Sequence, residues 1–277
     1  MIIQTKAYAK INLYLKILNK LPTGYHNIKT VMQKISLFDD IKINIKNNNK
    51  RNIKIKCSEA GISNETNTAY KAADLFLTHF GLTADIEITI GKNIPSQAGL
   101  GGGSSDAAAV LLSLNKYFDF ALSEKELIWL AAKIGADVPF FAADASCAVC
   151  EGIGDIVKPV ETALLGFFCL IVKPAYNIST KQAFNDFDDF RKSNRFFEFE
   201  FESDKYKNDF AALAFSQNED LKTIRGLILN SGASESELSG SGSALFGIFR
   251  DISDAQKCKN MLNRRNGIEF CDIFDFI

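Results

Sequence analysis

The sequence has almost no excess of charge of either sign. Its 277 residues include 32 Lys and Arg against 33 Asp and Glu, which gives a formal net charge of −1. Without a basic surplus, the chain lacks the electrostatic field that nucleic-acid-binding proteins use. Its apolar runs fall short of the ~20 residues of a membrane-spanning helix, and its first residues are too alternating and too charged for a signal peptide. We therefore expect a cytoplasmic globular protein with no nucleic-acid and no membrane partner.

Residues that bind transition metals are also scarce. The chain has two histidines, His26 and His79, which excludes a site built from several histidines. Six cysteines are scattered along the chain, and Cys147 and Cys150 form a lone C-x-x-C pair inside an apolar stretch. With no second pair and no histidine nearby, we expect buried free thiols in a reducing compartment rather than a zinc site.

Glycine, by contrast, is concentrated in the stretch PSQAGLGGGSSD at residues 95–106, where four glycines fall within five residues. The alanine-rich run that follows has apolar residues at helical spacing, with Ser104 or Ser105 as the expected N-cap. A glycine loop that leads into a helix presents backbone N–H groups to an anion, most often phosphate. The alternative is a glycine hinge with no ligand.

Two common nucleotide-binding loops do not fit this stretch. A Walker A loop needs a lysine after its last glycine, and no lysine stands there. The dinucleotide fingerprint fails because Ser104 takes the place of its third glycine. The stretch is therefore a phosphate loop of a third kind, or none.

The first half of the chain mixes strand and helix patterns. Residues 11–17 alternate as a strand, with Lys10 and Asn12 sharing its polar face. Residues 41–45 and 53–57 alternate around a polar segment, which predicts a hairpin. Helices are expected from the cap Asn67 to Phe80, after the glycine loop, and from the capping box of Ser123 and Glu126 to Gly135. Further strands are expected at residues 85–90, 145–151 and 155–160.

The second half is predicted to contain strands at 164–172, 245–249 and 268–274. Helices are expected from Ser179 or Thr180, and over 209–215, 219–229 and 254–266. The Phe-rich stretch 186–208 gives no clear pattern, although Phe197, Phe199 and Phe201 alternate with Glu as in a short strand. Strands occur both in pairs and separated by helices, so we expect an α+β protein with a boundary near residues 158–163.

Three motifs, in order, resemble the GHMP kinases, a family of ATP-dependent small-molecule kinases. They are AYAKINL at 7–13, PSQAGLGGGSSDAA at 95–108 and SGSGSA at 239–244. GYHNI at 24–28 and GADVPFF at 135–141 further resemble the members that phosphorylate a cytidine diphosphate-linked methylerythritol. The stretch Ser96–Ala98 is less glycine-rich than the family pattern. The alternatives are a sibling kinase of the homoserine or mevalonate type, and a nucleotide-binding sensor without activity.

The resemblance implies a two-domain fold. An N-terminal ATP-binding domain over 1–160 would hold a mixed sheet with the glycine loop and its helix, and an α/β sandwich-like domain would span 161–277. It also implies ATP as phosphoryl donor, Mg²⁺ held in part by a hydroxyl of Ser104 or Ser105, and a small-molecule substrate. For the assembly, we expect a monomer or a weak homodimer.

The resemblance pairs Lys10 with Asp137 as catalytic residues. Asp137 would take the hydroxyl proton of the acceptor, and Lys10 would keep the Asp137 carboxylate ionised. From the residues alone, each has an alternative interpretation. Asp137 could be a helix-stop aspartate that hydrogen-bonds the next backbone turn, and Lys10 could be an exposed strand lysine. The implied ATP-binding residues are Pro95, Ser96, Gln97, Ala98, Gly99, Leu100, Gly101, Gly102, Gly103, Ser104, Ser105, Asn67 and Lys92. The implied substrate-binding residues are Asn12, Tyr25, His26, Tyr176, Thr180, Phe184, Gly240 and Ser241.

Overall fold

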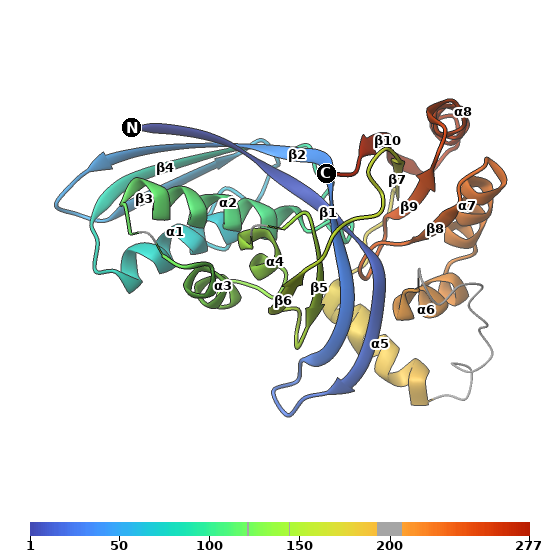
Figure 1. The fold of residues 1–277 in the computed structure, drawn as a ribbon, viewed down its shortest axis with the longest axis horizontal. Helices are drawn as coiled ribbons and strands as arrows, with labels where there is room; N and C mark the ends of the chain where they lie inside the picture. The colour runs from blue at the N-terminus through green and yellow to red at the C-terminus, as the bar shows by residue number, and fades with distance from the viewer. Residues whose placement is uncertain (121, 144, 193–206) are drawn as a thin grey trace. The chain divides into compact units, whose positions relative to one another are not determined.

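The computed structural model describes residues 1–120, 122–143, 145–192 and 207–277 (Figure 1). Its chain divides into two compact units, and it passes between them several times. Unit 1 contains Met1–Ala9, Leu37–Ile94 and Gly101–Val160, and unit 2 contains Lys10–Ser36, Pro95–Leu100 and Glu161–Ile277. The glycine loop is therefore divided, with Pro95–Leu100 in unit 2 and its last residues in unit 1. A domain division at residue 160 stays a prediction.

A mixed sheet runs through the N-terminal half in the order β3-β4-β2-β5-β6, and β1 pairs with β2. Its strands are β1 (Ile2–Lys20), β2 (His26–Asn47), β3 (Asn52–Cys57), β4 (Ala84–Gly91), β5 (Cys147–Glu151) and β6 (Ile156–Pro159). Unit 1 adds the helices α1 (Thr68–His79), α2 (Gly102–Tyr117), α3 (Glu124–Ala132) and α4 (Val138–Ala142). Helices α1 and α2 pack side by side (Figure 1).

The hairpin expected between residues 41–45 and 53–57 is wrong. Both strands exist, but β4 lies between them, with Ile88 opposite Ile43 of β2 in antiparallel register and opposite Ile55 of β3 in parallel register. Helix α1 follows β3 and leads into β4, and such a helical crossover joins parallel strands. Because Ile86, Ile88 and Ile90 are buried, β4 suits the position between the other two strands.

The C-terminal part of unit 2 is a four-stranded antiparallel sheet in the order β10-β7-β9-β8. Its strands are β7 (Phe168–Pro174), β8 (Glu235–Leu238), β9 (Leu245–Phe249) and β10 (Ile268–Asp275). The helices described in this unit are α5 (Thr180–Lys192), α6 (Asp209–Gln217), α7 (Glu219–Asn230) and α8 (Ile252–Leu262).

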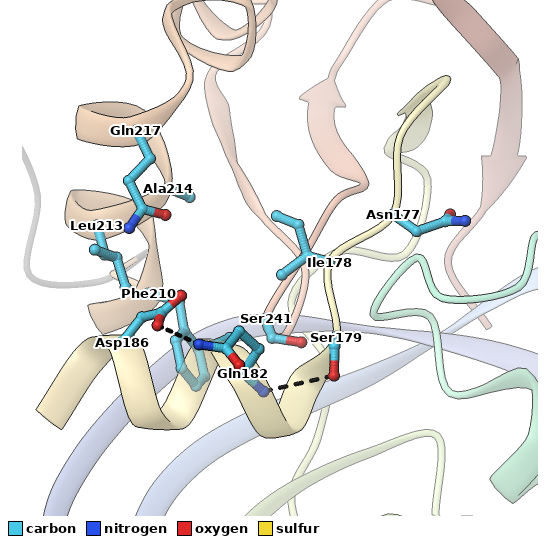
Figure 2. A pocket seen from close by; sticks show the side chains of 11 residues that line it. Asn177, Ile178, Ser179, Gln182, Asp186, Phe210, Leu213, Ala214, Gln217 and Ser241 are labelled. Carbon is cyan, nitrogen blue, oxygen red and sulfur yellow. Dashed lines mark hydrogen bonds between the residues drawn. The ribbon is translucent and has the colours of Figure 1, made fainter.

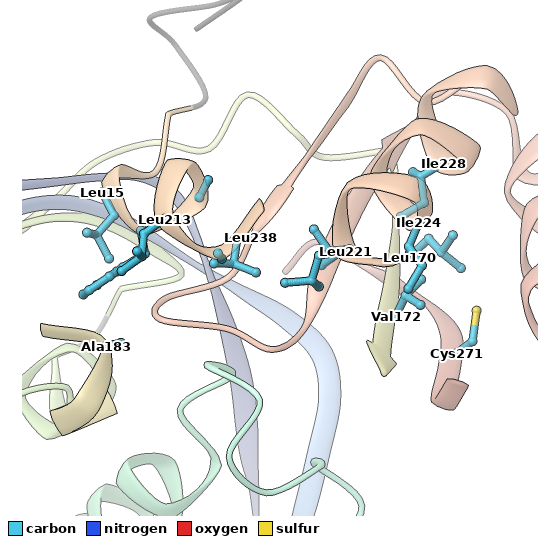
Figure 3. Packing of buried hydrophobic residues seen from close by; sticks show 14 of the residues in the cluster. Leu15, Leu170, Val172, Ala183, Leu213, Leu221, Ile224, Ile228, Leu238 and Cys271 are labelled. Atoms are coloured by element: carbon cyan, nitrogen blue, oxygen red, sulfur yellow. The ribbon is translucent and has the colours of Figure 1, made fainter. Parts of the chain in front are cut away.

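The core of unit 2 forms where α7 packs on this sheet. Ile224 and Ile228 of α7 contact the same apolar cluster as Leu170 and Val172 of β7 (Figure 3). A Cβ on Gly247 of β9 would lie 2.4 Å from Cγ2 of Ile228, so glycine there lets the helix approach the strand. Burial of each such Leu, Ile or Val side chain stabilises the unit by ~1.5–3 kcal/mol.

Most predicted elements are confirmed, as is the α+β class. The cap at Asn67 and the Ser123–Glu126 capping box occur as expected. The strands expected at 145–151 and 155–160 also occur, and they pair antiparallel as β5 and β6. The short helix α4 and strand β8 were not predicted. Of the Phe-rich stretch, residues 193–206, including Phe197, Phe199 and Phe201, lie outside the described residues. The six cysteines are free, and no described helix combines the length and apolarity that a membrane span requires.

Candidate active site

Lys10 and Asn12 of β1 lie buried in unit 2, not on an exposed face. They are 3% and 1% exposed. The Lys10 ammonium donates to Oδ1 of Asn12 at 2.6 Å and to the carbonyl oxygen of Gly99 at 2.9 Å. Asn12 in turn donates to Oγ1 of Thr30 on β2 at 2.8 Å, and Thr30 donates to the carbonyl of Tyr14 at 2.6 Å. The lysine is thus fixed in place against the glycine loop by a chain of hydrogen bonds.

The glycine loop also contacts the loop that follows β8, within unit 2. Gly99 has a φ of +75°, and a Cβ there would lie 2.0 Å from the carbonyl oxygen of Ser239. Oγ of Ser239 donates to the carbonyl of Gly99 at 3.0 Å, and the Ala244 amide donates to the carbonyl of Ala98 at 3.2 Å. The SGSGSA motif therefore supports the glycine loop directly, while Gly240 lies beside Asn12.

Asn208 also binds the loop between β8 and β9, residues 239–244, which we call the C-terminal loop. Its amide donates to the carbonyls of Leu238 and Gly240 at 2.7 and 2.8 Å, and its Oδ1 caps α6 through the amide of Phe210. Asn208 is 0% exposed. It was missed because it lies in the Phe-rich stretch, although an Asn followed by an apolar run is a known helix-start signal.

In unit 1, the end of the glycine loop forms the first turn of α2. The N-cap is Gly101, with a φ of 73°, and no side chain caps this end among the described residues. The expectation of a Ser104 or Ser105 cap is therefore wrong, because the helix begins at Gly102 and both serines lie inside its first turn. Since the first N–H groups of a helix lack intrahelical partners, this start is suited to bind phosphate.

A buried charge cluster lies directly beneath this turn, in unit 1. The Lys92 ammonium contacts Oδ2 of Asp39 at 2.5 Å and Oδ2 of Asp106 at 3.1 Å. Asp39 also accepts from the amides of Asn93 and Ile94 at 2.6 and 2.8 Å. Burial lowers the pKa of Lys92, but the two carboxylates outweigh it and hold that pKa above its ordinary value.

Asp106 is the less well satisfied acid of this cluster. Its buried Oδ1 has no hydrogen-bond partner among the described residues. Burial raises the pKa of Asp106, and the Lys92 charge only partly opposes that shift. The Lys92 ammonium is thus shared by two buried carboxyl groups. Neither acid was predicted, since nothing in the sequence marks an aspartate as buried.

Asn67 and the helix it caps also contribute to this region of unit 1. Both polar groups of the Asn67 amide are used locally, Oδ1 by the amide of Ala69 at 2.9 Å and Nδ2 by the carbonyl of Ile62 at 2.8 Å. Thr68, the next residue, donates through Oγ1 to the carbonyl of Gly103 at 2.6 Å. Helix α1 is thereby bonded to the first turn of α2. The implied ATP contacts of Asn67 and Lys92 stay predictions.

Asp137 is in unit 1, at the N-cap of the short helix α4. Its side chain makes no capping hydrogen bond, and its backbone is already near helical values, with φ −86° and ψ −12°. Pro139 follows within the first turn, where its missing N–H group removes no intrahelical hydrogen bond. Both interpretations of Asp137, as a catalytic residue and as a helix-stop aspartate, stay predictions. Lys10 belongs to unit 2, so the pairing of the two side chains stays a prediction.

Three of the predicted substrate-binding residues lie at the β1–β2 turn and on α5, all in unit 2. Tyr25 is 60% exposed and His26 is 7% exposed. The His26 ring stacks on Phe184 of α5, with centroids 4.8 Å apart and an interplanar angle of 14°. The structure therefore brings these two predicted residues together, while the Tyr25 ring faces solvent.

The remaining predicted substrate residues surround the C-terminal loop. The hydroxyls of Thr180 and Ser241 are 3.0 Å apart, and Ser243 donates to the carbonyl of Tyr176 at 2.7 Å. Burial, with a further contribution from the charge of Asp220, raises the pKa of the Tyr176 hydroxyl. Figure 2 shows a pocket of about 340 Å³ beside Ser241, between α5 and α6. Its other lining residues include Asn177, Ser179, Gln182, Phe210 and Gln217.

Comparison with known proteins identifies the family to which this chain is similar. Residues 67–145 match the GHMP kinases N terminal domain, and residues 181–268 match the GHMP kinases C terminal domain. A 4-diphosphocytidyl-2-C-methyl-D-erythritol kinase of Clostridium botulinum (strain Alaska E43 / Type E3) is 38% identical over 97% of both chains.

Two solved structures extend the comparison to the fold. A crystal structure of 4-(cytidine 5'-diphospho)-2C-methyl-D-erythritol kinase superposes with a TM-score of 0.78, at 28% identity and 99% coverage of both chains. The structure of L. major mevalonate kinase has a TM-score of 0.72 at 16% identity, covering 99% of this chain and 95% of that one, and shares the fold alone. With both domain models and a relative matched over nearly its whole length, the chain belongs to the GHMP kinase family.

Proposed function

We propose that this protein transfers the γ-phosphoryl group of ATP to the 2-hydroxyl of 4-diphosphocytidyl-2-C-methyl-D-erythritol, giving the 2-phosphate and ADP. This reaction belongs to the non-mevalonate route to isoprenoid precursors. The observation that carries the proposal is the buried Lys10 ammonium bound to the carbonyl of Gly99. A cation fixed on the glycine loop has the chemistry that a kinase needs where phosphate meets an acceptor alcohol.

Phosphoryl transfer depends on alignment and charge neutralisation more than on covalent chemistry by the protein. The N–H groups at the start of α2 would hold the phosphates of ATP. The acceptor oxygen forms its bond to the γ-phosphorus as the bond to ADP breaks, and the hydroxyl proton passes to the Asp137 carboxylate. Lys10 would keep that carboxylate ionised.

Mg²⁺ fits the donor set on the first turn of α2. This cation binds few protein oxygens and takes its other ligands from phosphate and water. Ser104 and Ser105 supply hydroxyl oxygens beside the N–H groups of the same turn, and Ser105 is 3% exposed. We propose that one of them helps to hold the ion, which would neutralise phosphate charge during transfer.

The proposal that the substrate carries a cytidine group is based on the names of the relatives and on the residues of the β1–β2 turn. An exposed Tyr25 offers a stacking surface to a base, and His26 next to it can hydrogen-bond a base edge. Thr180, Phe184 and Tyr176 would complete this side of the site, with Gly240 and Ser241 near the substrate phosphates.

A coupled assay of ADP release tests the proposal directly. With Mg-ATP and the methylerythritol substrate we expect turnover, and we expect CDP to inhibit it by competing for the base site. Turnover of homoserine or mevalonate without inhibition by CDP would assign the protein to a sibling kinase. ATP binding with no turnover of any of these alcohols would indicate a sensor and refute the proposed activity.

A further inference from the structure

Helix α5 holds the β1–β2 hairpin by three side chains on one face. Phe184, Asp188 and Arg191 are spaced so that they follow one another along the helix surface. Arg191 donates to the carbonyl of Leu18 at 2.6 Å, at the end of β1. Phe184 and Asp188 reach His26, at the start of β2. The helix therefore fixes both ends of the turn that carries Tyr25.

The His26 ring is held from two directions. Its Nε2 lies 2.7 Å from Oδ1 of Asp188, and its face stacks on Phe184. The His26 side chain is 4% exposed. One nitrogen and one face of the imidazole are thus occupied by the protein itself, and Nδ1 is the ring nitrogen that Asp188 does not engage.

Asp188 is itself fixed and charged. Its Oδ2 accepts from the Lys20 ammonium at 2.6 Å. Burial opposes ionisation of the carboxyl group, but the hydrogen bonds from Lys20 and His26 outweigh it and hold the pKa of Asp188 below its ordinary value. An ionised carboxylate only accepts hydrogen bonds, so the proton on a neutral His26 ring is held at Nε2.

We propose that Asp188 is a positioning residue for recognition of the cytidine base: it fixes the ring plane and protonation of His26, so that Nδ1 alone faces the base. This inference rests on the proposed function, since it takes the base to bind at His26. The Lys20–Asp188 pair taken alone would contribute little, because its lysine is 49% exposed and such pairs are screened by solvent. The bond to the buried histidine gives Asp188 its role.

The variant Asp188→Asn tests this inference because it keeps the shape of the side chain. Lys20 can only donate, so it would take the amide oxygen and leave the amide N–H group facing Nε2 of His26. The ring proton would then move to Nδ1. Asp189→Asn is the matched control, since Asp189 is the next residue on the same helix, 79% exposed and paired with the exposed Lys192.

Two measurements separate the possible results. ¹⁵N NMR of the imidazoles reports the protonated nitrogen of His26, and a His79→Gln variant assigns the two histidines of the chain. Calorimetry reports the affinity for CDP and, as a check of folding, for ADP. For Asp188→Asn we expect protonation to shift to Nδ1, CDP to bind about 10-fold more weakly, and ADP to bind as before. The KM for the cytidine substrate should rise with kcat nearly unchanged.

Each other outcome has a definite meaning. Unchanged CDP affinity in Asp188→Asn, or an equal loss in Asp189→Asn, overturns the role of Asp188 while the proposed function stands. Loss of kcat with KM unchanged also overturns it, because a base-positioning residue acts on binding. A wild-type protein that binds ADP but not CDP refutes the cytidine function itself, and the role of Asp188 falls with it.

Discussion

The substitution Gly99→Ala should break the link between the glycine loop and the C-terminal loop. A Cβ at residue 99 would lie 2.0 Å from the carbonyl oxygen of Ser239 and 2.9 Å from its carbonyl carbon. Both are backbone atoms, so no side-chain rotation relieves the overlap. The same residue has a φ of +75°, a region that alanine adopts only at a cost.

The expected loss of stability has two parts. The left-handed backbone costs an alanine about 1–2 kcal/mol, and forcing an extra carbon into packed atoms costs about 1–3 kcal/mol. Their sum is about 2–5 kcal/mol. The loop must also move away from Ser239, which displaces the carbonyl that binds Lys10. Since a misplacement of about 1 Å in a catalytic site can cost ~10²-fold in rate, kcat/KM should fall by about that factor.

Gly166→Ala is the matched control, because Gly166 has a φ of +82° but a Cβ there would meet nothing within 4 Å. It should lose only the backbone part, about 1–2 kcal/mol. Urea unfolding of both variants, with ADP-release kinetics, gives the comparison. If Gly99→Ala were no less stable and no less active than Gly166→Ala, the contact with Ser239 would have no energetic weight.

Three further predictions concern buried or catalytic acids. Asp137→Ala should lower kcat by at least about 10²-fold with ADP affinity unchanged by calorimetry; activity within a few-fold of wild type would exclude it as the base. In urea unfolding, Asp39→Asn should destabilise the protein by about 1–3 kcal/mol, because Asp39 accepts hydrogen bonds from three donors. Asp106→Asn should cost less, because the neutral amide resembles the protonated form of Asp106. Burial raises the pKa of Glu237 to about 7 from 4.5, so the native state binds the extra proton and stability falls as pH rises between those values. Glu237→Gln should therefore stabilise by at most about 3 kcal/mol at pH 8 and leave stability unchanged near pH 4, and an equal gain at both values would contradict this.

The sequence predicts local structure well because periodicity and caps act over a few residues. The caps at Asn67 and Ser123 and the strand 245–249 follow from neighbours along the chain, and all occur. The hairpin after β2 failed because strand order depends on distant pairing. Residues 41–45 and 53–57 alternate in the same way whether they pair with each other or with β4, and the helix between β3 and β4 decides the outcome.

The N-cap of α2 failed for a related reason. Serine is the better cap by propensity, but the chain must turn through a positive φ at Gly101 to enter the helix. A glycine-rich sequence offers several residues that could make this turn, so the pattern alone does not fix where the helix begins.

The residues of the candidate site could be proposed from their type, while their partners could not. Lys10 binds Gly99, 89 residues away, and His26 binds Asp188, 162 residues away. Burial of a charged or polar group requires such a partner, but the alternation around residue 10 is equally compatible with an exposed lysine, so the sequence does not show that Lys10 needs one. Which residue supplies it depends on how β1 and α5 pack, and the sequence around Asp188 has no pattern that reveals this. For His26 the distinction matters chemically, because under the proposed function its distant aspartate determines which ring nitrogen is left to bind the base.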